Sequence, residues 1–237
     1  MLNDWNINPD PETLAYHERQ WDRIYGSTID FARFADRWLC DSTRVYDLGC
    51  GAGSSTAWLA EEYPAKFVGV DISDKLLDIA RSKTKYIENV NFRKGDMCNL
   101  LHESDVDGVI SLQCLSWMRT IETPLDQICT KIRPQWMAFS SLFYEGEISC
   151  EIVVNERTRP RKSYYNIYSI PDVCRILYGH GYKLAAHQPF LIGADLPKPN
   201  NIDLMKTYTI PSEEGPRLQI SGPLMLPWYF LAFEREV

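Results

Sequence analysis

The sequence predicts an α/β fold with a seven-stranded, mostly parallel sheet, an antiparallel last strand and helices on both faces. From residue 43 onward, short β-branched apolar runs alternate with segments of helical periodicity, a pattern typical of parallel strands joined by crossover helices. A glycine-rich turn at 49–53 joins the first apolar run to the first of these helices. The final apolar run, MLPWYFLAFERE, is expected to close the sheet.

Two amphipathic helices precede the alternating region. Asp10 fits the N-cap and Pro11 the first turn of one helix, whose apolar face includes Leu14 and Trp21. A second helix is expected at 27–39, where aromatic residues recur at helical spacing. Residues 1–42 are therefore expected to be helical.

The region 43–142 carries the alternation that defines the core. The expected helices lie at 54–63, 74–84 and 121–132, and the expected strands are RVYDLG, KFVGVD, VNFRKGD, DGVISLQ and QWMAFSSLF. After the core, IPDVCRILYGHGY is typical of a helix that ends at glycine, and KLAAHQPFLI of a strand.

Two long segments, 143–168 and 192–224, interrupt the pattern, and the second contains a hairpin-like stretch, TYTIPSEEGPRLQIS. Long segments of this kind inside a compact domain are usually functional. Both follow strands that should be parallel, so we expect both at the carboxyl edge, where open α/β sheets bind ligands. The 237 residues thus predict a single domain, 1–237, in which two insertions cap a ligand site.

The glycine turn follows Asp47 at the end of the first predicted strand. Gly49, Gly51 and Gly53 let the backbone turn tightly and approach a ligand closely. A dinucleotide-binding GxGxxG fingerprint would require glycine at position 54, where this chain has Ser54. The turn therefore favours a nucleotide-like ligand and argues against a nicotinamide-dependent oxidoreductase.

Two further carboxylates end the next two predicted strands. Asp71 can accept both hydrogens of a ribose diol, and Asp96 can accept from an adenine amine while Met97 covers the ring. Together these residues predict an adenosine site. The competing interpretation is that the acids end strands at ordinary turns and that Met97 is a core residue.

The motifs VYDLGCGAGSSTAWLA, VGVDIS, KGDM and DGVISLQCLSWM resemble, in order and spacing, those of the class I S-adenosylmethionine-dependent methyltransferases. The resemblance covers about residues 43–142. It implies a Rossmann-like fold, an N-terminal helical lid and S-adenosyl-L-methionine as cofactor, with S-adenosyl-L-homocysteine as product. The cofactor-binding residues that it implies are Gln20, Tyr25, Thr28, Asp47, Gly49, Gly51, Asp71, Ile72, Asp96, Met97, Leu112 and Gln113.

The resemblance also implies methyl transfer to a small-molecule acceptor. Weak similarity of the flanks to methyltransferases among bacterial surface-polysaccharide enzymes favours an oxygen of a sugar, a nucleotide sugar or another anionic metabolite. The alternative is a non-catalytic protein that binds S-adenosylmethionine or S-adenosylhomocysteine in a regulatory or scaffolding role. No sequence motif separates the two.

Few side chains are obligatory for such a transfer, because the sulfonium carries its own leaving group. The candidates for a general base are His17, His187 and Glu145, each of which also fits an ordinary packed or surface role. The candidates for acceptor binding are aromatic residues together with two arginines of NERTRPRK, for which a solvated loop is the competing interpretation: Tyr16, Trp21, Trp117, Tyr144, Arg159, Arg161 and Tyr164.

Composition limits the remaining possibilities. The formal charge of −7 argues against a general nucleic-acid binder, and no apolar run approaches the roughly 20 residues that span a bilayer. The seven cysteines show no metal-binding or disulfide spacing and are expected to be reduced thiols in or near the core. We therefore expect a cytoplasmic monomer or homodimer without bound metal, nucleic acid or membrane.

Overall fold

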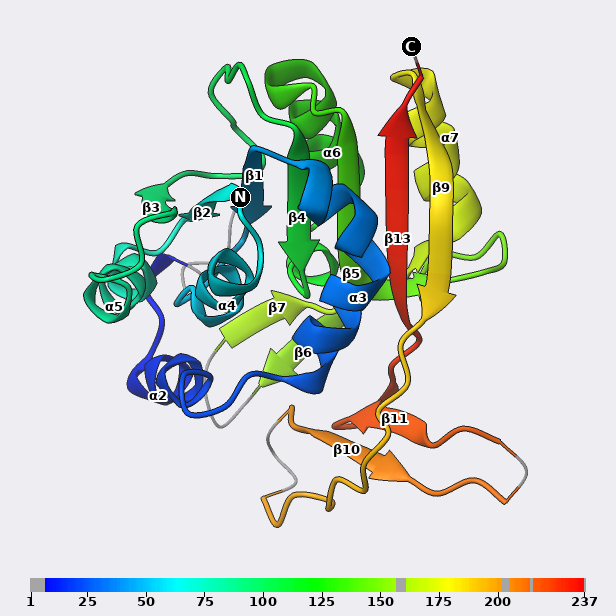
Figure 1. Cartoon of the computed structure of the whole chain (residues 1–237). Helices are drawn as coiled ribbons and strands as arrows, with labels where there is room; N and C mark the ends of the chain where they lie inside the picture. The colour runs from blue at the N-terminus through cyan, green and yellow to red at the C-terminus, as the bar shows by residue number, and fades with distance from the viewer. Residues whose placement is uncertain (1–6, 157–160, 202–204, 214, 237) are drawn as a thin grey trace.

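The computed structural model describes residues 7–156, 161–201, 205–213 and 215–236 (Figure 1). At its centre lies an eight-stranded sheet in the order β3-β2-β1-β4-β5-β13-β9, with a short β8 beside β5. These strands are β1 (Arg44–Leu48), β2 (Lys66–Asp71), β3 (Val90–Lys94), β4 (Gly108–Leu112), β5 (Trp136–Tyr144), β8 (Tyr168–Ser169), β9 (Tyr182–Pro189) and β13 (Trp228–Arg235).

Only β13 among these strands runs antiparallel to its neighbours, pairing with β5 and β9. This confirms the predicted mostly parallel sheet with its antiparallel last strand. The main path of the sheet has the seven strands predicted, and Tyr168 and Ser169 add a short parallel pairing at the end of β5 that the sequence analysis did not predict. Two residues are too few to produce a recognisable apolar pattern in the sequence.

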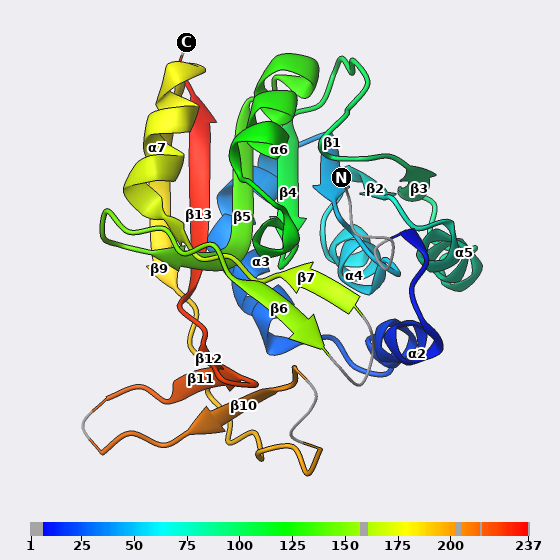
Figure 2. The same cartoon turned by 180° about the vertical axis from the view of Figure 1, so that it is seen from behind.

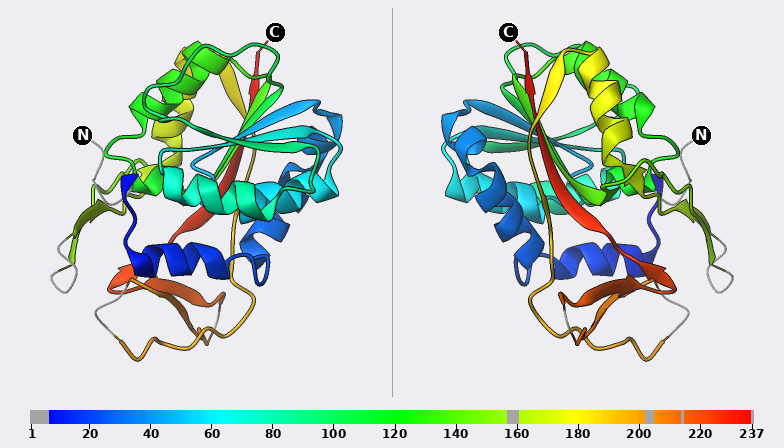
Figure 3. Two further views of the ribbon diagram at one scale, coloured as in Figure 1. Left: turned by 90° about the vertical axis from the view of Figure 1, so that its left-hand side faces the viewer. Right: turned by 90° about the vertical axis from the view of Figure 1, so that its right-hand side faces the viewer.

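Helices cover both faces of the sheet, as Figures 2 and 3 show. On one face lie α3, α4 and α5, and on the other lie α6, its π-helical extension η2, and α7. The helices are α2 (Pro11–Arg19), α3 (Gly26–Asp41), α4 (Ser54–Glu62), α5 (Asp74–Lys83), η1 (Leu115–Trp117), α6 (Glu122–Gln127), η2 (Ile128–Ile132) and α7 (Ile170–Gly179).

Each face of the sheet buries its own apolar layer. Beneath α3, the ring of Phe31 meets Phe230 of β13 edge-on at 5.5 Å, and the rings of Trp38 and Trp136 stack. The opposite layer packs α6 and α7 against the other side chains of the same strands. Because strand side chains alternate between faces, buried strands with two apolar faces read as nearly continuous hydrophobic runs.

Local signals fix the helix ends that the sequence predicted. The Asp10 carboxylate accepts the backbone N–H of Thr13 at 2.7 Å, which caps α2 just before Pro11.

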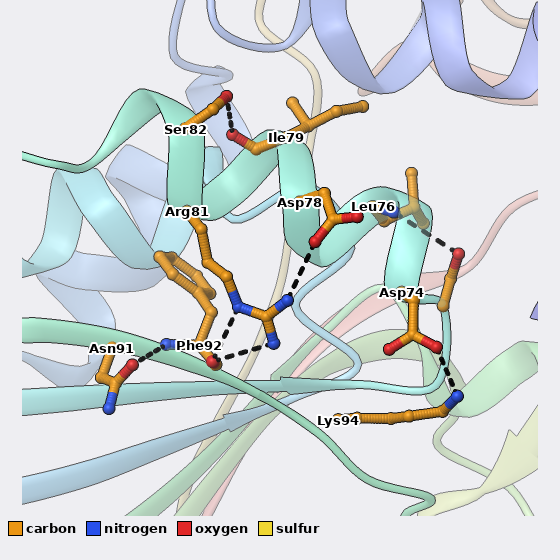
Figure 4. Close-up of polar contacts among 10 residues, drawn as sticks. Asp74, Leu76, Asp78, Ile79, Arg81, Ser82, Asn91, Phe92 and Lys94 are labelled. Atoms are coloured by element: carbon orange, nitrogen blue, oxygen red, sulfur yellow. Dashed lines mark hydrogen bonds and ion pairs between the residues drawn. The ribbon is translucent and has the colours of Figure 1, made fainter.

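On the edge of the sheet, the Arg81 guanidinium of α5 donates to the carbonyl of Phe92 in β3 and pairs with Asp78 (Figure 4). These contacts hold α5 onto the strand that follows it.

The two predicted insertions each carry a small sheet. The first forms β6 (Val153–Glu156) and β7 (Arg161–Tyr164), and the second forms β10 (Thr207–Ile210), β11 (Leu218–Ser221) and β12 (Leu224–Met225). The predicted hairpin-like stretch is confirmed, because β10 and β11 pair antiparallel. Both small sheets lie beyond the carboxyl edge of β1 and β4, at the lower side of Figure 1.

All seven cysteines are free thiols, as expected. Their predicted burial was wrong for Cys40 and Cys150, which are exposed. Cys40 lies near the end of α3, and Cys150 lies in the first insertion, so tertiary placement decided their exposure. In the part of the chain that the structure describes, no helix is long and apolar enough to cross a bilayer.

Candidate functional site

The glycine turn between β1 and α4 forms the base of the site. Gly49 and Gly51 adopt left-handed φ angles of 80° and 56°. A Cβ atom at Gly49 would lie 2.3 Å from Cys114 Sγ, so both conformation and space require glycine there. The turn is anchored to β2 by bonds from the N–H groups of Gly49 and Cys50 to the carbonyl of Val70.

Asp71 at the end of β2 faces this turn. Its Oδ2 accepts the N–H of Gly51 at 2.9 Å, and its Oδ1 accepts the N–H of Ser73 at 2.9 Å. Each oxygen keeps acceptor capacity for a further hydrogen bond, because an ionised carboxylate has about four lone-pair sites. Burial raises the pKa of this carboxyl, against the lowering effect of its backbone donors. The position and chemistry fit a ribose diol.

Asp47 is the most deeply buried acid of the site, at 2 % exposure. Its Oδ2 accepts the hydroxyl of Thr56 at 2.5 Å, while its Oδ1 has no hydrogen-bond partner among the described residues. Burial is the main cause that raises the pKa of Asp47 to about 7, with Asp71 adding and Thr56 opposing. An unpartnered buried carboxylate oxygen is unfavourable unless a ligand donates to it. The position of Asp47 Oδ1 fits the ammonium group of S-adenosylmethionine.

The residues proposed for the adenine end lie beyond β3. Asp96 accepts the N–H of Cys98 at 2.8 Å and forms an isolated bridge with Asn99, which fixes the turn. Met97 is 7 % exposed and belongs to the core layer beneath α6. It also reaches the glycine turn, since its Cε would lie 3.4 Å from a Cβ at Gly49. Ile72, between Asp71 and Ser73, is half-buried.

The end of β4 carries Leu112 and Gln113. Gln113 adopts an unusual φ of 58° for a residue other than glycine, and its N–H donates to the carbonyl of Ser140 at 2.6 Å. Its side-chain Nε2 donates to Ser27 Oγ at 3.0 Å. The first turn of α3 is thereby tied to the carboxyl edge of the sheet.

Helix α2 lies over the glycine turn. The ring of His17 approaches Gly51 so closely that a Cβ there would lie 2.9 Å from His17 Cε1. Trp21 Nε1 donates to the carbonyl of Ala52 at 3.1 Å, and Gln20 Oε1 lies 3.2 Å from His17 Nδ1. Burial lowers the pKa of His17. These contacts join the N-terminal helix to the turn on which the resemblance places the cofactor.

Aromatic side chains gather beside this helix. The rings of Trp117 and Tyr165 meet edge-on at 4.7 Å, and Tyr165 bonds to Ser221 of β11. Tyr16 interacts electrostatically with Tyr165 and with Tyr25, so α2, η1 and both insertions share one aromatic group. Tyr16, Tyr25 and Tyr144 are 43 %, 38 % and 46 % exposed, and Tyr164 is half-buried.

The structure does not bring the three candidate bases together. His187 is exposed on the edge strand β9, opposite Leu231. Glu145 is exposed and bonds to Tyr229 of β13, on the α7 side of the sheet. His17 alone touches the glycine turn. Arg159 lies outside the described residues, and only the backbone of Arg161 is described.

Sequence reasoning missed several residues of this edge. Thr56 could have been found, because a hydroxyl in the first turn of α4 faces the preceding strand end. Ser27, Ser140 and Trp228 carry no sequence signal for a site, since their positions at the edge depend on packing between distant elements. No group of three or more potential metal ligands occurs among the residues that the structure covers.

A family model described as a methyltransferase domain matches residues 45–135, from β1 to just before β5. The match contains the glycine turn, Asp71, Asp96 and the end of β4. Residues 45–135 are a methyltransferase domain of the class I S-adenosylmethionine-dependent type. The family resemblance of the motifs is thereby confirmed, as is the Rossmann-like methyltransferase fold.

Curated relatives of this chain are named as methyltransferases for different acceptors. Over 97 residues it is 34 % identical to trans-aconitate 2-methyltransferase of Azoarcus sp. (strain BH72), covering 40 % of this chain and 37 % of the relative. Over 156 residues it is 23 % identical to malonyl-[acyl-carrier protein] O-methyltransferase of Priestia megaterium, covering 60 % and 57 %. The chain thus spans between one third and three fifths of these relatives.

Solved structures extend the similarity of the methyltransferase fold to most of the chain. A putative methyltransferase in complex with the Haloferax volcanii Trm112 activator has a TM-score of 0.64 and 16 % identity, with 94 % of each chain covered. Magnesium protoporphyrin IX methyltransferase of Synechocystis PCC 6803 with bound S-adenosylhomocysteine has a TM-score of 0.58 and 16 % identity, covering 95 % and 86 %. At these identities the comparison establishes the fold alone.

Proposed function

We propose that this protein transfers the methyl group of S-adenosylmethionine to an oxygen of a small-molecule acceptor. The observation that carries the proposal is Asp47, whose Oδ1 is buried without a described partner beside the glycine turn. Asp71 lies across the same turn with acceptor capacity remaining on both oxygens. A buried anion next to a diol-binding acid suits a ligand that is both cationic and a ribonucleoside.

The chain's own residues bind and orient in this proposal. Asp47 accepts from the cofactor's ammonium group, Asp71 from the ribose hydroxyls, and Asp96 from the adenine amine. When bound, the cofactor supplies a methyl carbon whose bond to sulfur breaks as the new bond to the acceptor oxygen forms. His17 of α2 and Trp21, just after this helix, cover the turn and exclude water.

A carboxylate is the acceptor class that this edge suits best. An ionised oxygen needs no general base, whereas a hydroxyl acceptor gains from one. His187 and Glu145 are exposed and lie on other parts of the sheet, which leaves His17 as the candidate base with a contact to the glycine turn. Two relatives are named for trans-aconitate and malonyl substrates, both of which carry carboxylates.

The test is methyl transfer by the purified full chain. Isotopically labelled S-adenosylmethionine is supplied with trans-aconitate, small dicarboxylic acids, sugar phosphates and nucleotide sugars, and both labelled product and S-adenosylhomocysteine are measured. Transfer to a carboxylic acid, lost in Asp71→Ala, is the expected result. Transfer restricted to the sugar compounds would favour the hydroxyl acceptor instead.

The same experiment separates catalysis from simple binding. Calorimetry with S-adenosylhomocysteine, run in parallel, should show uptake by the wild-type chain. Uptake without turnover on any acceptor of the panel would support a regulatory or scaffolding protein. Absence of uptake would overturn the proposal altogether.

A further inference from the structure

Two buried hydrogen-bond donors of the central sheet, one on β5 and one on β13, have no partner among the residues that the structure describes. Ser140 Oγ of β5 and Trp228 Nε1 of β13 are both inaccessible to water and have no partner among the described residues. Ser140 is 1 % exposed, and the indole nitrogen of Trp228 is buried although the residue is half-buried overall. Native proteins rarely leave such groups unsatisfied without a bound partner.

The strand register places these two donors on one face. Ser140 pairs with Phe230, and Leu142 pairs with Trp228, so Ser140 and Trp228 are diagonal neighbours across β5 and β13. Directly paired residues project to the same side of a sheet, and diagonal neighbours are about 7–8 Å apart, within reach of a long side chain. One ligand group can therefore contact both.

The register also places the pair at the carboxyl edge. Trp228 begins the antiparallel strand β13, and Ser140 approaches the end of β5. Both face α3, because Phe230 next to them packs edge-on against Phe31. One helical turn before Phe31 is Ser27, which receives the hydrogen bond from Gln113. The two donors and the Gln113 side-chain amide thus lie at the same carboxyl edge of the sheet.

We infer that Ser140 and Trp228 bind a carbonyl or carboxyl oxygen of the methyl acceptor. This inference rests on the proposed function, and it names the group by which the acceptor is held. An indole N–H can only donate, so the ligand atom opposite Trp228 must be a hydrogen-bond acceptor. The Ser140 hydroxyl can donate to the same planar oxygen.

The contacts of Ser140 and Trp228 place the bound oxygen beside the end of β4. The carbonyl of Ser140 accepts the N–H of Gln113, one of the residues that the family resemblance assigns to the cofactor. An oxygen held by Ser140 therefore lies next to the end of β4. The edge-on contact of Trp228 with Phe190 and the packing of Phe190 on Phe230 make the rest of this subsite apolar. An acceptor with an apolar body and one planar oxygen group fits it.

The inference is tested by NMR on the indole N–H signals of the full chain saturated with S-adenosylhomocysteine. The carbonyl probes are benzoate and benzamide, and toluene is the matched probe without an acceptor oxygen. The Trp228 signal, assigned by its loss in Trp228→Phe, should shift with both carbonyl probes and not with toluene. The signals of Trp38 and Trp136, already bonded to Glu234 and Ser42, are internal controls that should stay fixed.

Two conservative variants measure the energetic role of the pair. Trp228→Phe keeps an aromatic ring and Ser140→Ala keeps the volume, and each should weaken benzoate binding about fivefold, the usual effect of one hydrogen bond. Ser104→Ala, on the exposed loop before β4, is the control and should leave binding unchanged. S-adenosylhomocysteine affinity should be the same in all four proteins.

The outcomes separate this inference from the proposed function. If the Trp228 signal is unchanged by every probe, the inference is wrong. If the signal keeps a contact with water in the presence of the probes, a buried water satisfies the donors and the inference is also wrong. That result leaves methyl transfer in the acceptor panel unaffected. Conversely, a carbonyl-dependent shift without any methyl transfer would retain the binding site and refute the enzymatic proposal.

Discussion

The two halves of the carboxyl edge are built in different ways. On the β1-β2-β3 side, the turn at 49–53 and three acids lie between residues 47 and 96. On the β4-β5-β13 side, the polar groups come from Ser27, Gln113, Ser140 and Trp228, on elements far apart in the chain. We propose that the first half recognises the cofactor through the backbone and carboxylates, and the second the acceptor through neutral donors in an aromatic setting.

This difference teaches where specificity resides. A turn that depends on left-handed backbone angles tolerates few residue types. The cofactor half can therefore be identified from the sequence. The acceptor half depends on which side chains packing leaves unpartnered, and many residue types can supply a donor. The following experiments test whether the halves are separable, in order of decreasing expected effect.

The largest effect is expected for Gly49→Ala. The left-handed conformation costs about 1–2 kcal/mol for an L-residue, and the overlap with Cys114 Sγ adds about 1–3 kcal/mol. Chemical denaturation should therefore show a loss of about 2–5 kcal/mol in unfolding free energy, and cofactor affinity should collapse. The control is Gly179→Ala, where no atom lies within 4 Å of the added carbon.

A smaller loss is expected for Asp71→Ala. Removing a carboxylate that accepts charge-assisted hydrogen bonds should weaken S-adenosylhomocysteine binding by about 1–3 kcal/mol in calorimetry. Asp74→Ala, which removes an exposed ion pair with Lys94, should change binding by less than about 1 kcal/mol. Equal affinity of the Asp71 variant and the wild type would contradict the ribose assignment.

Asp47 should make cofactor binding depend on pH. Its folded pKa, raised to about 7, exceeds the ordinary value of 3.8, so the cofactor-free protein is destabilised by this group as pH rises between these values. A cationic ammonium favours the ionised form. Affinity should therefore increase as pH rises, by up to about tenfold per pH unit below 7, and level off above it.

Two variants sharpen the pH measurement. Asp47→Asn should bind weakly at every pH, because it lacks the titrating carboxyl. His17→Gln keeps a polar side chain at Gly51 and removes the other titrating group of α2 at the turn. If the pH dependence follows His17 rather than Asp47, the assignment of the ammonium partner is wrong.

The smallest effect is expected for Trp21→Phe. This change removes the bond from the Trp21 indole, just after α2, to the Ala52 carbonyl and keeps most of the packing. Dissociation of S-adenosylhomocysteine in stopped-flow experiments should accelerate about fivefold, the equivalent of one hydrogen bond. The matched control is Trp58→Phe, because the Trp58 ring packs against the core layer beneath α3. S-adenosylhomocysteine should leave this variant at the wild-type rate.

Much of the fold followed from sequence pattern. The alternation, the glycine turn and the cap formed by Asp10 and Pro11 predicted the strand and helix positions, because each depends on residues close together in the chain. The pairing of β8 was missed, since two residues create no periodic signal. The exposure of Cys40 and Cys150 was also missed, because burial depends on what else packs nearby.

The sequence by itself determined the glycine turn and the order of the acids behind it, since left-handed backbone and strand-end carboxylates are local requirements. Only the tertiary structure decided that Asp47 Oδ1 lacks a partner within the described part of the chain and that His17 lies on Gly51. The same is true of Ser140 and Trp228, which are diagonal neighbours only because β13 returns antiparallel beside β5. Whether a donor is satisfied depends on every element around it, and that information is distributed over the whole chain.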